Sequence, residues 1–424
     1  MAANTSQSAS PLKNPLPAPT SSSRPKDRPA LTPDQQEKYD WLLSQAKSWK
    51  EVPSTKGKAG PLTDTERLWL TRECLLRYLR ATKWHQQEAE KRLLDSLTWR
   101  REYGVEDVLT WEHISPENET GKQIIVGYDN EGRPCHYLNP GRQNTDVSPR
   151  QNQHFIFMLE RVIELMPAGV ETIALLINFK QSKTRKHTAP GIAQGREVLH
   201  MLQTHYPERL GKALIINVPW VVWGFFKLIT PFIDPLTRQK LKFNEDMRQY
   251  VPEQELWTEF GGKLNFEYDH ETYWPALRKL CEEKRTFRKK RWVAGGSHIG
   301  EHEDYLAGGK ETGVAGTLRQ GDEKTGKEGE ATQAPAPAAE FASKGARDGA
   351  PTATTEADTA GTVGQSEEKE TDVTSAPAPG APVVGGAADV TDALAKVELE
   401  GRPEGHFEAD SAKPENGTAK VEGV

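Results

Sequence analysis

The chain lacks the motifs on which most enzymes depend. It has no G-x-S-x-G or G-x-G-x-x-G sequence, and its histidines and cysteines show no metal-site spacing. Residues 321–327 (GDEKTGK) match a phosphate-binding loop up to its lysine, but Glu328 stands where a serine or threonine must hold magnesium. We therefore predict a protein that is not an enzyme and that uses neither a cofactor nor a metal.

Cysteine is scarce, with three residues in a chain of 424. An odd number without metal-ligand spacing argues against a disulfide framework and indicates a reducing compartment. The sequence has no signal peptide and no run of about 20 apolar residues, the length that a membrane-spanning helix requires. We therefore expect a cytoplasmic protein whose contact with any membrane is peripheral.

Negative charge is concentrated at the end of the chain. Residues 301–424 contain 25 acidic and 11 basic residues, which leaves 36 acidic and 44 basic residues in 1–300. The acidic part has no tryptophan and consists largely of Ala, Gly, Pro, Thr and Glu, so it cannot bury enough apolar surface to offset chain entropy. We predict disorder in residues 1–32 and an acidic, low-complexity disordered tail over residues 293–424.

Hydrophobic spacing divides the remaining residues into a helical region, 33–110, and an α/β domain, 111–292. The first region is predicted to contain helices over 33–50, from Thr63 or Thr65 to about residue 80, and over about 85–102. The second shows apolar strands at 123–129, 133–139, 171–179 and 213–218, and helices at 151–166, 192–205 and 271–291. Continuous apolar strands that alternate with helices predict a mixed, largely parallel sheet covered by helices.

The most apolar stretch follows the last of these strands. In residues 220–229 (WVVWGFFKLI) only Gly224 and Lys227 are not apolar, whereas a surface helix normally has a polar face. The segment is therefore either a buried core helix or a helix that contacts lipid part of the time. Hydroxyl and cationic groups follow at 237–240, as a ligand with a fatty tail and a charged head would require.

A basic run, 284–291 (KRTFRKKR), ends the last predicted helix. Without interleaved aromatic residues, such a run is more often a solvated face or a docking patch for acidic lipid than a nucleic-acid site. We expect no nucleic-acid partner.

Five motifs in the expected order resemble the CRAL-TRIO lipid-transfer family. They are residues 75–84 (LLRYLRATKW), 205–211 (HYPERLG), 215–219 (IINVP), 231–240 (PFIDPLTRQK) and 259–263 (EFGGK). Within that family, the chain is most similar to fungal phosphatidylinositol transfer proteins of the yeast secretory, azole-tolerance-linked branch. The resemblance implies an N-terminal helical tripod and a bowl whose sheet floors a lipid pocket beneath an apolar gating helix. The function it implies is phosphatidylinositol binding and transfer between membranes, affecting phosphoinositide and lipid homeostasis.

The resemblance also assigns residues to the lipid. It places head-group binding at Lys83, Glu208, Thr237 and Lys240. It places the gate and acyl pocket at Trp220, Val221, Trp223, Phe225, Phe226, Leu228, Ile229 and Phe232. Thr82 precedes Lys83 where many relatives have arginine, so head-group binding would depend more on Lys240.

Departures from the family pattern bear on the partners. Residues 178–185 (NFKQSKTR) are bulky and basic where relatives that also take phosphatidylcholine have a Ser/Thr-containing strand end, so we do not expect phosphatidylcholine as the second ligand. Resemblance to the azole-tolerance-linked subgroup implies a sterol as the alternative occupant. The alternative function is a lipid-sensing regulatory scaffold that recruits a lipid kinase or a membrane-contact partner. Peripheral association is expected at lipid droplets, the endoplasmic reticulum or the cell periphery.

Overall fold

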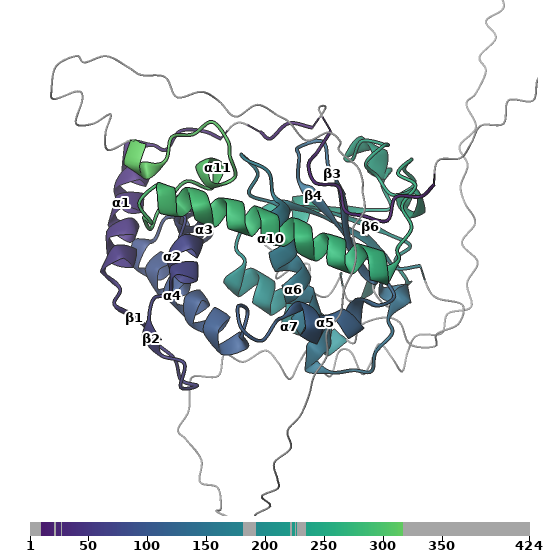
Figure 1. Ribbon diagram of the computed structural model, residues 1–424, viewed down its shortest axis with the longest axis horizontal. Helices are drawn as coiled ribbons and strands as arrows, with labels where there is room; N and C mark the ends of the chain where they lie inside the picture. Colours follow the sequence, from purple (N-terminus) through teal and green to yellow (C-terminus); the bar gives the residue numbers. More distant parts are fainter. Residues whose placement is uncertain are drawn as a thin grey trace, which may run out of the picture. The chain divides into compact units, whose positions relative to one another are not determined.

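Five strands form one sheet at the centre of the structure, and helices pack on it (Figure 1). The computed structural model describes residues 10–20, 23–26, 28–180, 192–220, 223–224, 226 and 235–316, all within one unit, Met1–Gln333. The strands lie in the order β3-β4-β5-β6-β7. Their bounds are β3 Gln123–Tyr128, β4 Pro134–Leu138, β5 Ile173–Asn178, β6 Leu210–Ile216 and β7 Leu241–Phe243.

The sheet is mixed and largely parallel, as predicted. β3 and β4 are antiparallel and joined by a turn in which Gly132 has a φ of +74°, a conformation that suits glycine. Every later pair of neighbours, from β4–β5 to β6–β7, is parallel. Strand β7 was not predicted, because three residues are too few to show a hydrophobic period.

The first four helices of the described chain form a core of their own. They are α1 Pro33–Ser48, α2 Asp64–Trp69, α3 Arg72–Ala81 and α4 Gln86–Tyr103. The predicted helix from Thr63 to about residue 80 is in fact two helices, because Leu70 leaves helical geometry and the Thr71 side chain caps a new helix. Leu42, Leu75 and Leu93 are fully buried between these helices. A two-stranded ribbon, β1 Glu51–Val52 and β2 Gly60–Pro61, joins α1 to α2.

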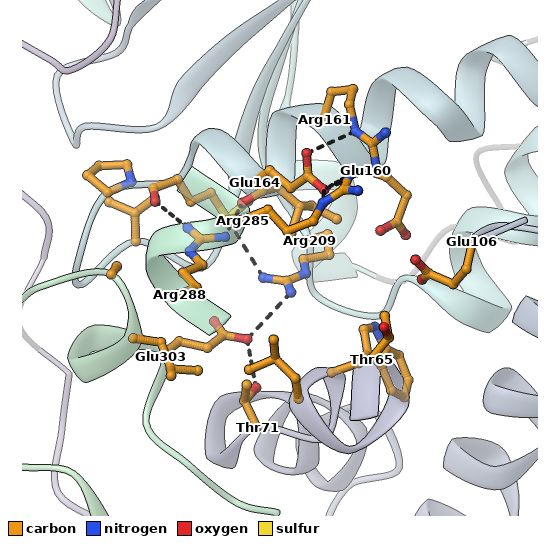
Figure 2. A pocket seen from close by; sticks show the side chains of 18 of the residues that line it. Thr65, Thr71, Glu106, Glu160, Arg161, Glu164, Arg209, Arg285, Arg288 and Glu303 are labelled. Carbon is orange, nitrogen blue, oxygen red and sulfur yellow. Dashed lines mark hydrogen bonds and ion pairs between the residues drawn. The ribbon is translucent and has the colours of Figure 1, made fainter. Parts of the chain in front are cut away.

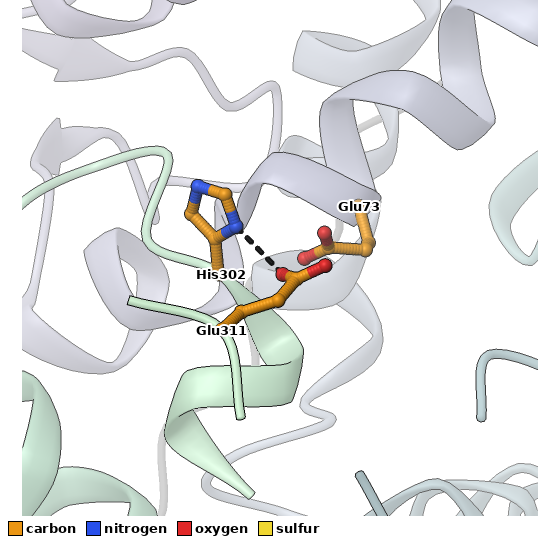
Figure 3. A group of neighbouring side chains, drawn as sticks. All are labelled: Glu73, His302 and Glu311. Atoms are coloured by element: carbon orange, nitrogen blue, oxygen red, sulfur yellow. Dashed lines mark hydrogen bonds and ion pairs between the residues drawn. The ribbon is translucent and has the colours of Figure 1, made fainter. Parts of the chain in front are cut away.

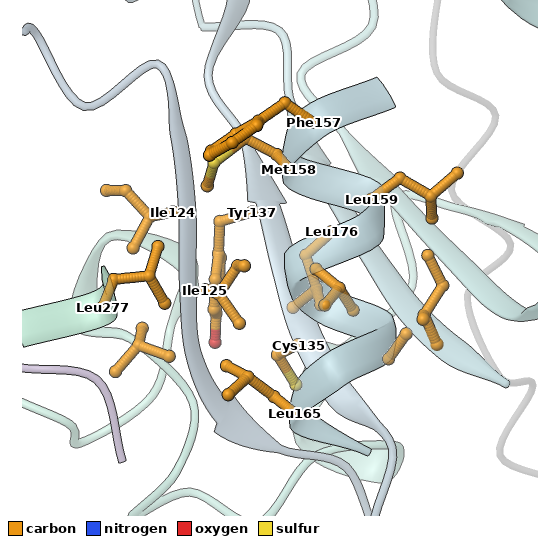
Figure 4. Close-up of a cluster of buried hydrophobic side chains, with 14 of the residues drawn as sticks. Ile124, Ile125, Cys135, Tyr137, Phe157, Met158, Leu159, Leu165, Leu176 and Leu277 are labelled. Carbon is orange, nitrogen blue, oxygen red and sulfur yellow. The ribbon is translucent and has the colours of Figure 1, made fainter. Parts of the chain in front are cut away.

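Helix α6 packs directly on β3 and β4, and α5, α7 and α10 pack against α6. Their bounds are α5 Trp111–Asn118, α6 Pro149–Leu165, α7 Ile192–His205 and α10 His270–Ala294. Figure 4 shows the resulting core, in which Phe157 and Leu159 of α6 lie beside Tyr137 and Leu176 of the sheet. Helix α5 was not predicted; it is short and contains Pro116, which obscures the helical pattern. Shorter elements are η1 Pro140–Arg142, α9 Pro235–Lys240, η3 Met247–Gln249, η4 Thr258–Phe260 and α11 Glu303–Leu306.

Part of the predicted N-terminal disorder is folded. Residues 10–20 run along the domain: the Leu12 N–H donates to the Asn265 carbonyl at 2.8 Å, and the Thr20 N–H donates to Glu255 Oε1 at 2.7 Å. Backbone hydrogen bonds to the domain hold this segment although its composition is that of a linker. The prediction of disorder over 1–32 was wrong for these residues.

The beginning of the predicted tail is folded as well. Residues 297–316, which we call the C-terminal strap, bury Ile299 and Leu306 to 4% and 3% exposure. The Gly300 N–H donates to the Leu70 carbonyl at 2.8 Å, and the Arg72 N–H donates to the Glu301 carbonyl at 2.9 Å. Ile299 and Leu306 help to anchor the strap, but two apolar residues do not stand out in the composition of the long acidic segment. Residues 317–424 lie outside the described part of the chain.

Candidate functional site

One face of the sheet carries an apolar surface that is only partly covered. Successive strand residues point to opposite faces, and on β5 and β6 Leu176 and Leu214 join the main core. The residues of the other face form a second apolar cluster with β7 and neighbouring residues. Its buried members are Phe179, Ala213 and Ile215, and the half-buried residues around them include Leu175, Ile177, Leu241 and Phe243. These half-buried side chains form an apolar floor.

The described residues of the predicted gate lie against this floor. The ring centroid of Trp223 is 4.8 Å from that of Phe243, and the centroid of Phe226 is 5.0 Å from it. The Trp223 N–H donates to the Pro219 carbonyl at 3.0 Å, which closes a helical turn. Trp220, at the start of this turn, is 71% exposed. Val221, Phe225, Leu228, Ile229 and Phe232 lie outside the described residues.

Two of the predicted head-group residues, Lys83 and Glu208, each form a hydrogen bond with Arg80. Lys83 follows the end of α3, and its N–H donates to the Arg80 carbonyl at 3.0 Å. The Arg80 guanidinium in turn donates to the Glu208 carboxylate. Lys83 and Glu208 are both exposed and have φ values of +51° and +56°, a conformation that non-glycine residues rarely adopt. Strain of this kind is most often found at functional sites.

The other two predicted head-group residues lie at the same edge of the sheet. Thr237 and Lys240 are three positions apart on α9, and β7 begins immediately after Lys240. Because β7 is parallel to β6 with Leu241 opposite Ala213, Lys240 lies beside the beginning of β6. Glu208 also precedes the beginning of β6. The register thus places Lys240 and Glu208 near the beginning of β6, and the role of the four predicted head-group residues in binding stays a prediction.

Thr82 is structural. It is 3% exposed, and its hydroxyl donates to the Tyr78 and Leu79 carbonyls at 3.0 and 3.2 Å. The cation at this edge that sequence reasoning missed is Arg80. Its motif, LLRYLRATKW, was recognised, but its partner Glu208 belongs to a different motif, and only the tertiary structure pairs them.

A chain of ion pairs connects Glu208 to the C-terminal strap. Arg80 Nη2 is 3.3 Å from Glu171 Oε2, and Arg77 Nη1 is 2.9 Å from the same oxygen. The other side of the Arg77 guanidinium is 2.8 Å from Glu303 Oε1 in α11. Burial alone would raise the pKa of Glu303, but Arg77 and Arg209 hold that pKa well below its usual range. The strap therefore contributes a carboxylate that is ionised at neutral pH.

Known protein families match the two parts of the chain separately. The CRAL/TRIO domain matches residues 118–262, and the CRAL/TRIO N-terminal domain matches residues 38–95. The phosphatidylinositol transfer protein PDR17 of Saccharomyces cerevisiae is 43% identical over 249 residues, which cover 57% of this chain and 71% of that protein. The chain belongs to the CRAL-TRIO family.

Other relatives of this CRAL-TRIO protein differ in length. The CRAL-TRIO domain-containing protein C23B6.04c of Schizosaccharomyces pombe is 56% identical over 283 residues, which are 66% of this chain but 28% of that relative. The SEC14 cytosolic factor of Candida glabrata is 27% identical over 211 residues, 45% of this chain and 70% of that protein. The chain thus spans less than a third of the first relative. The C-terminal strap lies beyond both matched domains.

A neutral polar network joins the CRAL-TRIO sheet to helix α6. His136 Nε2 donates to Gln123 Oε1 at 2.9 Å, and Gln123 Nε2 donates to His154 Nδ1 at 3.2 Å. Both histidines are fully buried. Burial lowers the pKa of His136 to about 3 and that of His154 well below its usual range, so both rings are neutral at physiological pH. This network was not anticipated, because an isolated histidine in a strand gives no signal of its partners.

Three potential metal ligands, Glu73, His302 and Glu311, meet where the strap crosses α3 (Figure 3). His302 Nδ1 is 2.8 Å from Glu311 Oε2. Glu73 is 3.5 Å from Arg28 and 3.4 Å from Arg72, and it accepts the Glu303 N–H at 2.6 Å. Because Glu73 already has cationic and amide partners, this cluster is explained as a tie between the strap and α3.

No helix in the described part of the chain is long and apolar enough to cross a membrane.

Proposed function

We propose that this protein binds phosphatidylinositol and transfers it between membranes. The observation that carries the proposal is the partly covered apolar floor, with Trp223 and Phe226 on it. The predicted head-group residues Glu208 and Lys240 lie near the beginning of β6, which contributes Ala213 and Ile215 to this floor. The 43% identity to PDR17, a phosphatidylinositol transfer protein by name, supports it.

A carrier of this kind removes a large energetic barrier. A two-chain phospholipid in water exposes some thirty methylene groups, each costing about 0.8 kcal/mol. In the proposal, the acyl chains rest on the apolar floor and the helix beginning at Trp220 covers them. When that helix opens, its apolar side chains need an apolar environment, which a bilayer supplies. The exposed Trp220 is suited to enter the membrane interface first.

The head group would be held by residues at the edge of the sheet. The Thr237 hydroxyl and the Lys240 ammonium can together bind the phosphate. Glu208 can accept hydrogen bonds from inositol hydroxyls, and Arg80 fixes the position of that carboxylate in the absence of lipid. Since the proposed chemistry is binding alone, we propose that the protein has no catalytic activity.

The test combines lipid identification with a transfer assay. Mass spectrometry of lipid extracted from the purified protein should identify phosphatidylinositol. Thr237→Val combined with Lys240→Ala should abolish phosphatidylinositol transfer between vesicles, while Lys242→Ala, in the adjoining strand β7, should not. Unchanged transfer by the double variant would remove the head-group assignment.

We also propose a sterol as the second ligand, which the same lipid extract should contain.

The alternative function is recruitment, in which the exposed basic side of α10 would bind a lipid kinase or a membrane-contact protein. Phe287 on this helix is 47% exposed, and Lys289 and Lys290 are exposed beside it. Charge reversal at these two lysines should then impair the cellular function while transfer in vitro persists. Normal cellular function in that variant would argue against recruitment through α10.

A further inference from the structure

A second cavity lies away from the apolar floor, where α2, α3, α6, α10 and α11 meet. Its volume is about 170 Å³. Figure 2 shows it from close by, with Arg209, Arg285 and Arg288 directed toward one another and Glu303 beside them. Apolar side chains, including Trp69, Val170 and Leu306, complete its wall. We call it the arginine cavity.

The charges that line the arginine cavity do not balance. Five arginines face four glutamates: Arg100, Arg161, Arg209, Arg285 and Arg288 against Glu106, Glu160, Glu164 and Glu303. Two of these carboxylates form ion pairs with Arg100, whose guanidinium is 2.6 Å from both Glu106 and Glu160. Four arginines are thus left to share Glu164 and Glu303.

Glu164 is fully engaged by two of those four. It is 3.0 Å from Arg161 and 2.5 Å from Arg285. Arg161 Nε and Glu164 Oε2 are nevertheless buried without a hydrogen-bond partner among the described residues, because their contact has poor geometry. Buried polar atoms without partners are uncommon in folded proteins and call for an explanation.

Arg209 and Arg288 are the least compensated cations. Arg209 is 3.6 Å from Glu303, which is held more closely by Arg77 at 2.8 Å. Arg288 has no carboxylate within ion-pair distance in the described part of the chain. It donates to the Met166 and Ile163 carbonyls at 2.8 and 3.4 Å. These bonds satisfy carbonyls at the end of α6, and the negative end of that helix's dipole compensates only part of the charge of Arg288.

Burial in the cavity wall lowers the pKa values of both Arg209 and Arg288. Burial, together with the charge of Arg77, lowers the pKa of Arg209. Burial likewise lowers the pKa of Arg288, with Glu303 and Glu164 opposing the effect only from a distance. Neither Nε atom has a hydrogen-bond partner among the described residues, so both guanidinium groups retain a donor for a ligand.

We propose that the arginine cavity binds a small phosphate-bearing ligand through Arg209 and Arg288. The lining carries one more arginine than glutamate, so we expect its ligand to be an anion. A phosphate group has three strong acceptor oxygens and can therefore accept hydrogen bonds from two guanidinium groups at once, whereas a carboxylate offers two oxygens. The cavity, at about 170 Å³, is slightly larger than the roughly 150 Å³ that holds a benzene ring in an engineered protein cavity. It therefore accommodates phosphate with a compact organic group against Trp69 and Leu306.

This site is distinct from the proposed head-group site, although they share a turn. Glu208 and Arg209 are adjacent in sequence; Glu208 pairs with Arg80, whereas Arg209 lines the cavity and reaches Glu303. Two of the cavity's walls, α10 and the C-terminal strap, lie beyond the residues that match the family domains. The inference therefore goes beyond lipid transfer and does not depend on it.

Isothermal titration of the full chain with inorganic phosphate, in chloride buffer of constant ionic strength, tests the proposal. We expect saturable binding to the wild type and at least a tenfold rise in the dissociation constant for Arg288→Met. Lys289→Met removes a neighbouring exposed charge from the same helix and should change nothing. Arg288→Met also removes bonds to α6, so a second variant is needed. Ala307→Phe fills the cavity wall without touching an ion pair and should weaken binding as strongly.

Further titrations separate the sources of phosphate. Glycerol 3-phosphate should compete with inorganic phosphate if the ligand is a soluble monoester, and phosphatidylinositol vesicles should compete if it is a lipid head group. The variant Thr237→Val with Lys240→Ala should bind phosphate as the wild type does. The proposal is overturned if the wild type shows no saturable binding, if both cavity variants bind normally, or if binding is lost only in the head-group variant.

Discussion

At the scale of single residues, Arg80 decides how the predicted head-group edge is arranged. Its guanidinium contacts Glu208 and, at 3.3 Å, Glu171, and its backbone carbonyl accepts the Lys83 N–H. A lysine in its place would keep the charge but could not contact Glu208 and Glu171 with a planar fork. The geometry of this edge therefore depends on a guanidinium rather than on positive charge alone.

Arg80→Ala should lower phosphatidylinositol transfer several-fold, because Glu208 loses the partner that fixes its direction. Arg80→Lys should recover only part of this loss. Vesicle transfer assays check both variants, with Lys91→Ala as the control, since Lys91 is an exposed residue of the next helix that, among the described residues, forms an ion pair with Asp95 alone. Equal transfer by Arg80→Lys and the wild type would show that charge alone is needed.

The buried histidines predict a pH dependence of stability. Unfolded histidine takes up a proton near pH 6.5, whereas burial lowers the pKa of His136 in the folded protein to about 3. Between these values the unfolded state binds more protons, so the free energy of unfolding falls as pH falls, by about 1.4 kcal/mol per pH unit for each such histidine. Urea denaturation from pH 7 to pH 4 should give a shallower slope for His136→Gln. The exposed His85→Gln is the control, and an unchanged slope in the His136 variant would contradict the assignment.

At the scale of elements, the C-terminal strap completes the helical region in front of the sheet. It bonds through its backbone to Leu70 and Arg72, and it brings the Glu303 carboxylate to Arg77 and Arg209. Without it, two guanidinium groups near α3 would lose a carboxylate in a poorly solvated environment, which is costly. The strap is therefore part of the fold although both matched domains end before it.

Ile299→Ala and Leu306→Ala should each destabilise the protein by about 2–5 kcal/mol, the usual cost of emptying a fully buried aliphatic position. Both side chains are almost completely buried. Chemical denaturation measures the loss, and Val293→Ala, at a position that is 56% exposed in the last turn of α10, is the matched control. If the two strap variants are as stable as the control, the strap does not contribute to the folded unit.

Sequence reasoning succeeded where the signal is local. The continuous apolar runs gave β5 and β6, helical spacing gave α1 and α4, and Gly104 marked the end of α4 correctly. It failed where the outcome depends on residues far apart. The pairing of Arg80 with Glu208 spans two motifs, and the apolar residues of the strap were hidden in the composition of the tail. Such contacts cannot be derived from spacing, because they depend on how segments far apart in the sequence pack together.

At the scale of the whole molecule, the predicted carrier needs one surface that is stable in water and ready to enter a bilayer. Trp220 satisfies both requirements. It is 71% exposed, so the folded state gains little from burying it, and it begins the turn that carries Trp223 and Phe226 over the apolar floor. Tryptophan favours the membrane interface, where its ring is buried and its N–H stays hydrated.

Trp220→Ser should therefore weaken vesicle binding and slow lipid transfer several-fold while leaving the melting temperature almost unchanged. Vesicle co-sedimentation, a transfer assay and a thermal melt of the same preparation separate these effects. Val147→Ser is the matched control, because Val147 is an exposed apolar residue at 82% exposure in the loop before α6, away from the second apolar cluster. A fall in melting temperature equal to that of a core variant would show that Trp220 belongs to the fold. Unchanged vesicle binding with unchanged transfer would mean that the protein meets the membrane through another surface.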